Sequence, residues 1–329
     1  MQLHSMPPLE IACNRQDAVD VPAIRRILVI VDPTADSQVV VDKAAKIAAV
    51  LGSELELYVC DVERAPPATA VEPAAGEEFS PSRTRDILED LEHYAEPLRT
   101  RGLSVTTRCE WHAPLEQGIG HHVLRSRPDL VIKETHRHAA AARIALTDWT
   151  LIGQLPAPLL LVRPTPWPAH PSIAVAVDPC HIAERPRSLD HALISLGCLI
   201  ANGLAGRLEA WHVLESPPHL PGEPATPMEV ARQNGAARDQ VAAVIGVANN
   251  LATSIKAHFL DGPVAQALGG FAAERKPDLL VLGAAARPRY IHSAASGTAA
   301  QLLEQLDCDL LVVKPAGFVS PLLVREEEA

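Results

Sequence analysis

The sequence has 329 residues and a net charge of −11, with 47% hydrophobic but only 3% aromatic side chains. An acidic chain lacks the basic surface that phosphate recognition requires, so we expect no nucleic-acid partner. Because no apolar run reaches the ~18 residues of a membrane-spanning helix and residues 1–23 have no apolar core, we expect no membrane association, no signal peptide and a cytoplasmic location.

After an N-terminal extension of residues 1–23, the first half alternates strands and helices. An apolar strand at residues 26–31 ends at Asp32. The elements expected next are a helix over Gln38–Leu51, a strand over Ser53–Asp61, a helix over Pro81–Arg101, a strand over Ser104–Trp111, a helix between Pro114 and Pro128, a strand from Leu130 and a last strand over Pro158–Pro164. Proline-rich residues 165–171 are typical of a stiff linker, so we place the first domain at residues 24–164.

The second half repeats this order. Its first strand, at residues 172–177, ends at Asp178. The elements expected next are a helix over Arg187–Leu204, a strand over Arg207–Leu214, a helix over Pro227–Leu251, a strand over Ser254–Leu260, a helix between Pro263 and Pro277, a strand from Leu279 and a last strand over Asp309–Pro315. We place the second domain at residues 172–316 and a C-terminal tail at residues 317–329.

The repeat predicts the fold class. Pro128-Asp129 and Pro277-Asp278 end matching helices at the same spacing from Pro114 and Pro263. Aliphatic strands separated by helices favour right-handed βαβ crossovers and parallel sheets covered on both faces. We therefore predict an α/β protein of two tandem, doubly wound, parallel five-stranded sheets with strand order 3-2-1-4-5.

A ligand site is expected where the strand order reverses, between the first and fourth strands of such a sheet, beyond their carboxyl ends. In the second domain Gly283 leaves the fourth strand, and a Ser-Gly-Thr sequence opens the last helix. Small residues let backbone approach a phosphate, and a helix N-terminus favours an anion. The candidate residues are Asp178, Gly283, Ala286, Arg287, Ser296, Gly297 and Thr298. An ordinary turn, with Ser296 as the N-cap of the helix, is the structural alternative.

The first domain has histidines in place of that glycine. His136 and His138 follow its fourth strand and His112 ends its third, and Asp148 precedes the last helix. Together they are candidate zinc ligands. Strands three and four are not neighbours in this topology, however, so solvated loop histidines are the alternative. His121-His122, on the preceding helix, is expected to be a surface pair.

The motifs in combination resemble the universal stress protein family, in its tandem, two-domain (UspE-like) branch, over about residues 24–321. They are Gly283 with Ser296-Gly297-Thr298, Cys308–Pro315, Gly317–Pro321, His136-Arg137-His138 and Thr147-Asp148-Trp149. The resemblance implies an adenine nucleotide alpha hydrolase-like (Rossmann-like) fold and ATP held by the second domain, with Asp178 near adenine and ribose and residues 283–298 at the phosphates. It also implies a degenerate first domain, in which Asp32 is structural, an intramolecular pseudo-dimer through the two last strands, and a homodimer.

The sequence departs from the family's ATP-binding motif. Ala286 stands where the second glycine is expected, and the third is replaced by Ser296 or displaced to Gly297. Two functions stay open. The first is a stress-response binding and signalling protein that holds an adenine nucleotide or another small anionic ligand. The alternative is a nucleotide-independent scaffold, or a module for a metal or small ligand, with both nucleotide sites lost.

A catalytic function has little support in the sequence. It has no Gly-x-Ser-x-Gly nucleophile elbow and no phosphate-binding Gly-x4-Gly-Lys motif. The six cysteines form no Cys-x2-Cys pair. Four of them lie beside or within apolar strand or helix patterns, so buried free thiols are the expectation. Cys60 and Cys180 lie near strand ends, with no base evident beside either. We expect at most a weak ATPase.

Overall fold

The computed structural model describes residues 8–12, 23–61, 81–135, 137–138, 143–144, 146–180, 187–214, 226–247, 254–284 and 298–323. They fall into two compact units. The first domain is Ile24–Pro166 together with Val319–Ala329, and the second domain is Trp167–Phe318 together with Met1–Ala23.

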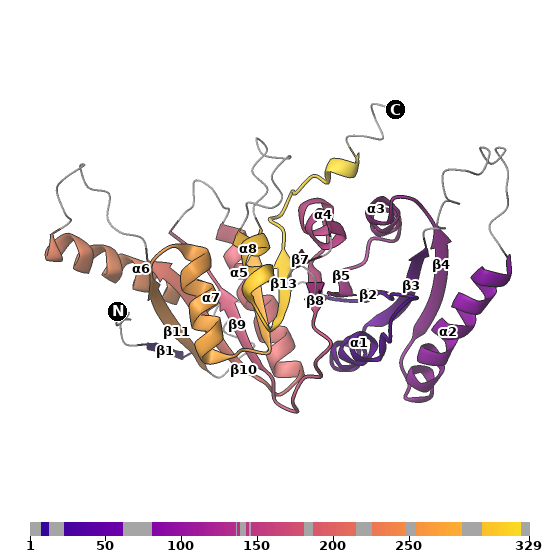
Figure 1. Ribbon diagram of the computed structural model, residues 1–329. Coiled ribbons are helices and arrows are strands. Elements are labelled where there is room, and N and C mark those ends of the chain that lie inside the picture. Colours follow the sequence, from indigo (N-terminus) through magenta and orange to yellow (C-terminus); the bar gives the residue numbers. More distant parts are fainter. Residues whose placement is uncertain are drawn as a thin grey trace. The chain divides into compact units, whose positions relative to one another are not determined.

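The first domain has a parallel five-stranded sheet with the order β4-β3-β2-β5-β8 (Figure 1). Its strands are β2 (Arg26–Ile30), β3 (Glu54–Asp61), β4 (Val105–Trp111), β5 (Leu130–Glu134) and β8 (Leu159–Val162). Its helices are α1 (Gln38–Leu51), α2 (Pro81–Thr100), α3 (Leu115–Ser126) and α4 (Leu146–Gln154). A short antiparallel ribbon, β6 (Arg137–His138) with β7 (Arg143–Ile144), follows β5.

The second domain repeats the topology as β11-β10-β9-β12-β13. Its strands are β9 (Ser172–Ala176), β10 (Arg207–Leu214), β11 (Ser254–Asp261), β12 (Leu279–Gly283) and β13 (Asp309–Val313). Its helices are α5 (Arg187–Gly203), α6 (Pro227–Val247), α7 (Val264–Arg275) and α8 (Thr298–Gln305). Both sheets therefore have the predicted order, counted along each domain as 3-2-1-4-5.

Right-handed crossovers distribute the helices over both faces of each sheet. From β2 the chain winds in one direction to β3 and β4, and then reverses to β5 and β8, so the later helices cover the opposite face. Accordingly α1 contacts α2 and α3 contacts α4, and Figure 1 shows α1 across the sheet from α3 and α4. The central strands are buried on both sides, as their aliphatic sequences predict.

The matched Pro-Asp dipeptides hold the amino ends of the first and fourth strands together. Asp129 Oδ2 accepts hydrogen bonds from the backbone N–H groups of Arg25 and Arg26, at 2.8 and 2.9 Å. Asp278 Oδ2 accepts one from Ser172 N–H at 2.7 Å. These carboxylates satisfy amides at the sheet edge that no neighbouring strand reaches, which explains why both copies carry the motif.

The N-terminal extension adds a strand to the second domain, and the C-terminal tail from Val319 onward packs on the first. Residues Leu9–Ala12 form β1, which pairs antiparallel with β11 at the edge of the second domain. In the first domain, Ser320 Oγ donates to the Gln154 carbonyl at 2.8 Å. A Cβ on Gly120 would lie 2.2 Å from Leu322 Cδ1, so the glycine leaves room for the leucine.

Among the described helices, none is long and apolar enough to cross a membrane.

Candidate functional site

Strand register brings three of the predicted ligand residues to one edge of the second domain. Ala176 of β9 pairs with Leu282 of β12. Asp178 and Ala284 lie two residues beyond this pair. Gly283 is the last residue of β12 and pairs with Val313 of β13. The helix α8 begins at Thr298 and leads into β13, which is parallel to β12, so α8 begins at this same edge. Asp178, Gly283 and Thr298 therefore surround the point where the strand order reverses.

The loop after β9 is fixed by a buried carboxylate. Asp178 N–H donates to Asp190 Oδ1 at 2.8 Å, and Asp190 lies in the first turn of α5 with 1% of its surface exposed. Asp178 itself is half-buried. The backbone is thus held by α5, while the Asp178 carboxylate belongs to the switch-point edge.

Four predicted ligand residues lie outside the described residues. They are Ala286, Arg287, Ser296 and Gly297. Their part in a phosphate loop stays a prediction, and so does the assignment of Ser296 as an N-cap.

Lys314, within the Cys308–Pro315 motif, is a cation at this edge that was not predicted as a ligand residue. It follows β13 directly, beside the Gly283–Val313 pair of the sheet. Its Nζ lies 4.9 Å from the centre of the Phe318 ring, a cation–π contact. Burial lowers the pKa of Lys314 to about 8, because the surroundings solvate its charge poorly. An anion placed nearby would favour its charged form.

The same edge of the first domain is filled by the protein's own charges. Asp148, fully buried in the first turn of α4, lies 2.9 Å from Lys133 Nζ and accepts a hydrogen bond from Thr135 Oγ1 at 2.6 Å. Lys43 of α1 is also buried and donates to the Arg163 carbonyl at 3.0 Å. The Asp148 of the Thr-Asp-Trp motif therefore forms an internal ion pair.

Asp32, the counterpart of Asp178, is bound within its own turn. Its Oδ1 accepts hydrogen bonds from Thr34 N–H at 2.8 Å and from Thr34 Oγ1 at 2.6 Å. These contacts are those of a structural residue, in agreement with the role that the sequence analysis gave it.

The described residues do not include the full set of candidate zinc ligands. His112 follows β4, and its ring lies 5.2 Å from that of His121, centre to centre. His138 is in β6, and His136 lies outside the described residues. No group of three or more His, Cys, Asp and Glu side chains suited to a metal occurs among the residues that the structure describes. Zinc binding stays a prediction.

The interpretation of His121-His122 as a surface pair is wrong for His122. It is 2% exposed and stacks on Tyr58, with ring centres 4.1 Å apart. Its two ring nitrogens lie 3.2 Å from Glu56 and 3.4 Å from Glu110. A hydrogen bond from His122 lowers the pKa of Glu56 against the effect of burial. Spacing could have identified it, because Ile119, His122 and Val123 fall on one helix face.

The second domain has a related cluster around Glu209 of β10. His258 Nε2 lies 3.3 Å from its carboxylate, and Arg275 and Trp211 also donate to it. Burial acts to raise the pKa of Glu209, but the hydrogen bonds from these three residues outweigh it and lower the pKa to about 2. Phe271 packs edge-on against Trp211 of β10, at the position where His122 stacks on Tyr58 in the first domain. Both clusters hold a helix on its sheet.

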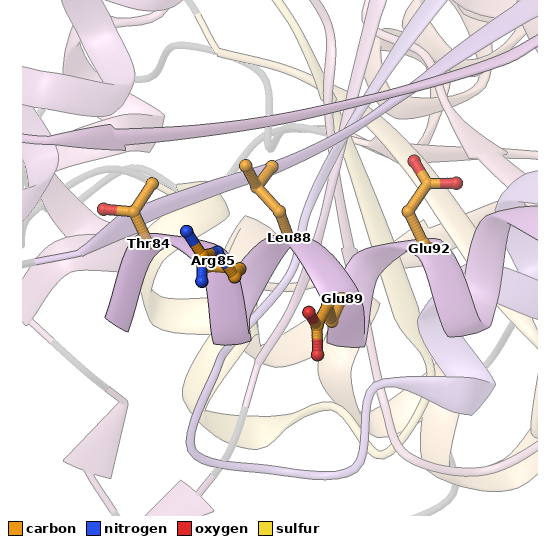
Figure 2. A pocket seen from close by; sticks show the side chains of 5 residues that line it. All are labelled: Thr84, Arg85, Leu88, Glu89 and Glu92. Carbon is orange, nitrogen blue, oxygen red and sulfur yellow. The ribbon is translucent and has the colours of Figure 1, made fainter. Parts of the chain in front are cut away.

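A hollow of about 460 Å³ lies along α2. Figure 2 shows its lining on successive turns of that helix: Thr84, Arg85, Leu88, Glu89 and Glu92. Glu92 is already bound to Arg99 and accepts from Thr107 Oγ1 at 2.7 Å. The hollow is a groove on the helix surface and is not at the switch-point edge.

Known proteins resemble the chain over nearly its whole length. The model of the universal stress protein family matches twice, at residues 23–163 and 171–314. Universal stress protein E of Escherichia coli strain K12 is 24% identical over 328 residues, which cover 92% of this chain and 98% of that protein. The Salmonella typhi protein of the same name is also 24% identical, over 323 residues, with the same coverage.

Solved structures give the same answer for the fold. A functionally unknown protein from Pseudomonas aeruginosa PAO1 superposes with a TM-score of 0.70 at 25% identity, covering 93% of this chain and 96% of that one. A universal stress protein from Archaeoglobus fulgidus has a TM-score of 0.58 at 12% identity, over 89% and 97% of the two chains. With both halves matched by the family model and both folded as predicted, the chain belongs to the universal stress protein family as a tandem of two such domains.

Proposed function

We propose that the second domain binds an adenine nucleotide such as ATP, or another small anionic ligand, at the edge between β9 and β12. The chain would act through this site as a cytoplasmic binding and signalling protein of the stress response, without a dedicated catalytic activity. The observation that carries the proposal is the register that puts Asp178, Gly283 and the start of α8 at the switch point.

The chemistry of this edge suits a phosphate. Backbone N–H groups at the start of α8 point toward the loop that precedes it, and the helix dipole favours negative charge there. Gly283 adds no side chain to the strand end, and Lys314 adds a partly dehydrated cation to the adjacent strand. Asp178 would accept from ribose hydroxyl or adenine N–H groups.

Comparison with the first domain supports the choice of domain. Its switch-point edge already contains the buried Lys133–Asp148 ion pair, to which Thr135 is hydrogen-bonded. A phosphate would compete with Asp148 for Lys133 at a site without the glycine. We therefore expect one nucleotide per chain. The pairing of the two domains and the homodimer that the resemblance implies stay predictions.

A thermal shift measurement with Mg·ATP tests the proposal. ATP should raise the melting temperature of the unchanged protein and should fail to raise that of Asp178→Ala. The matched control is Asp32→Ala, which removes the equivalent carboxylate from the first domain and should keep the response. No shift at millimolar ATP in the unchanged protein would contradict nucleotide binding and favour the scaffold, in which Ala286 marks a lost site.

A further inference from the structure

Cys180 and His212 lie side by side at the carboxyl edge of the second domain. Cys180 is exposed and follows β9, while His212 belongs to β10, which pairs with β9. Cys180 Sγ lies 3.7 Å from His212 Nε2, within hydrogen-bonding distance for sulfur. The expectation that no base lies beside this cysteine is therefore wrong. The two residues are 32 positions apart, and only strand pairing brings them together.

The other ring nitrogen of His212 determines where the proton lies. His212 Nδ1 is 3.0 Å from the Val177 carbonyl oxygen. A carbonyl oxygen only accepts hydrogen bonds, so Nδ1 carries a hydrogen. In the neutral imidazole, Nε2 is then the basic nitrogen, and it faces the thiol. The ring is 3% exposed, which keeps it in this orientation.

The first domain has no such pair at the equivalent place. Its loop reads Asp32-Pro33-Thr34 where the second domain has Asp178-Pro179-Cys180. Ile30 pairs with Tyr58 in the first sheet, and Ala176 pairs with Trp211 in the second, so Tyr58 and Trp211 are equivalent. The next residues, Val59 and His212, are therefore equivalent too. The shared scaffold thus needs neither the thiol nor the base, and their presence together points to chemistry rather than packing.

Two carboxylates belong to the same corner of the domain. They are Asp178, two residues before the cysteine, and Asp190, which binds the Asp178 amide. The basic Nε2 of His212 is the nitrogen that faces the thiol. The thiol proton is therefore expected to pass within the Cys180–His212 pair.

We propose that Cys180 is a nucleophilic thiol, activated by His212, that forms mixed disulfides with small-molecule disulfides. His212 Nε2 takes the thiol proton, and the thiolate attacks one sulfur of the disulfide. A new bond joins Cys180 to that sulfur as the original S–S bond breaks. The second sulfur leaves as a thiolate and takes a proton from the imidazolium. Cys180 is oxidised and one half of the small disulfide is reduced, independently of any nucleotide.

The pH dependence of alkylation in the unchanged protein is the first test. Iodoacetamide is applied between pH 5.5 and 9, and modification of each cysteine is followed by peptide mass spectrometry. Cys180 should react about tenfold faster than Cys109 or Cys308 near pH 6.5, because a thiol beside a histidine forms thiolate below the ordinary pKa of about 8.5. A Cys180 profile that rises only around pH 8.5 overturns the proposal. In His212→Gln, whose amide cannot take the proton, the profile should return to that of an ordinary thiol.

Glutathione disulfide tests the reaction itself. At pH 7 the reduced protein should acquire a mixed disulfide first at Cys180. The adduct should be absent from Cys180→Ser and retained in the control Cys308→Ser. Equal adducts at Cys109, Cys180 and Cys308, or none at Cys180, would contradict the proposal. Because the unchanged protein gives both deciding results, a variant that fails to fold does not affect the test.

Discussion

At the carboxyl edge of the first domain, Lys133 and Asp148 form a buried ion pair, and Thr135 binds the same carboxylate. The register of the two sheets aligns Lys133 with Leu282 and Thr135 with Ala284 in the second domain. At the end of α4 the Leu155 amide donates to the Leu151 carbonyl, and at the end of α8 the Leu306 amide donates to the Leu302 carbonyl. When these two bonds are superposed, Asp148 aligns with Ala299. Small and apolar residues thus replace every member of the charged network.

The difference teaches that one scaffold can carry a buried charged network at the carboxyl edge of its sheet or small and apolar residues at the same positions. In the first domain, internal side chains supply the charges that a bound ligand would otherwise bring, and the edge becomes part of the core. In the second domain, the same positions contribute no charge, and we propose that an anion binds at the start of α8. Stability should therefore depend on this edge in the first domain, and binding should depend on it in the second.

The largest expected effect comes from breaking the buried ion pair. Asp148→Ala, which copies Ala299, leaves Lys133 without its carboxylate and should lower the free energy of unfolding of the first domain by about 3–5 kcal/mol. Guanidinium denaturation measures the loss. The double variant Asp148→Leu with Lys133→Met should recover most of it, because no buried charge is then left unpaired. A single variant as stable as the unchanged protein would contradict a structural role for this edge.

The part of the C-terminal tail from Val319 onward should matter to the first domain alone. Leu322 is 2% exposed and packs against Gly120 of α3. Leu322→Ala should cost about 2 kcal/mol, at the low end for a buried leucine because a chain end relaxes easily. Hydrogen exchange should show faster exchange in α3 and α4 and unchanged exchange in α7 and α8. Val319→Ala, at an exposed tail position, is the control.

Asp129 and Asp278, the carboxylates of the Pro-Asp dipeptides, allow the stabilities of the two domains to be compared at equivalent positions. Asp129→Ala removes the acceptor for two backbone amides and Asp278→Ala the acceptor for one. We expect losses of about 1–2 kcal/mol in unfolding free energy, larger for Asp129. The asparagine variants should lose less, since the side-chain carbonyl still accepts. Equal stability of both alanine variants and the unchanged protein would show that solvent satisfies these amides.

The cluster around Glu209 in the second domain allows a test by pH. The folded-state pKa of Glu209 is about 2, below its ordinary value of 4.5, so its contribution is present above about pH 4.5 and is lost as the pH falls toward 2. Glu209→Gln should be less stable at neutral pH and should lose less stability than the unchanged protein over that window. Melting temperatures at pH 7, 4 and 3 provide the comparison. Parallel curves for the two proteins would refute the assignment.

Sequence patterns predicted the scaffold well because local chemistry determines it. Aliphatic runs, prolines and the repeat placed ten strands, and Gln38–Leu51 and Arg207–Leu214 have the observed bounds. The strand β1 was missed because four residues, Leu9–Ala12, show too little periodicity, and their partner β11 lies far away in the chain.

The site was predicted less completely because it depends on contacts between distant residues. The histidine at 122 lay on a helix face that spacing could have identified, but its stacking on Tyr58 requires the sheet. The Lys133–Asp148 and Cys180–His212 contacts join residues on different elements, which no local motif encodes. The place of Asp178 and Gly283 at the switch-point edge was predicted because it depends on strand order alone, and their role in ligand binding stays a prediction.

The number of nucleotides bound per chain tests the contrast between the domains most directly. Isothermal titration with Mg·ATP should give one site for the unchanged protein and for Asp32→Ala, and none for Asp178→Ala. Two sites per chain, or a site lost with Asp32 and retained without Asp178, would contradict the account of a closed first domain and an open second one.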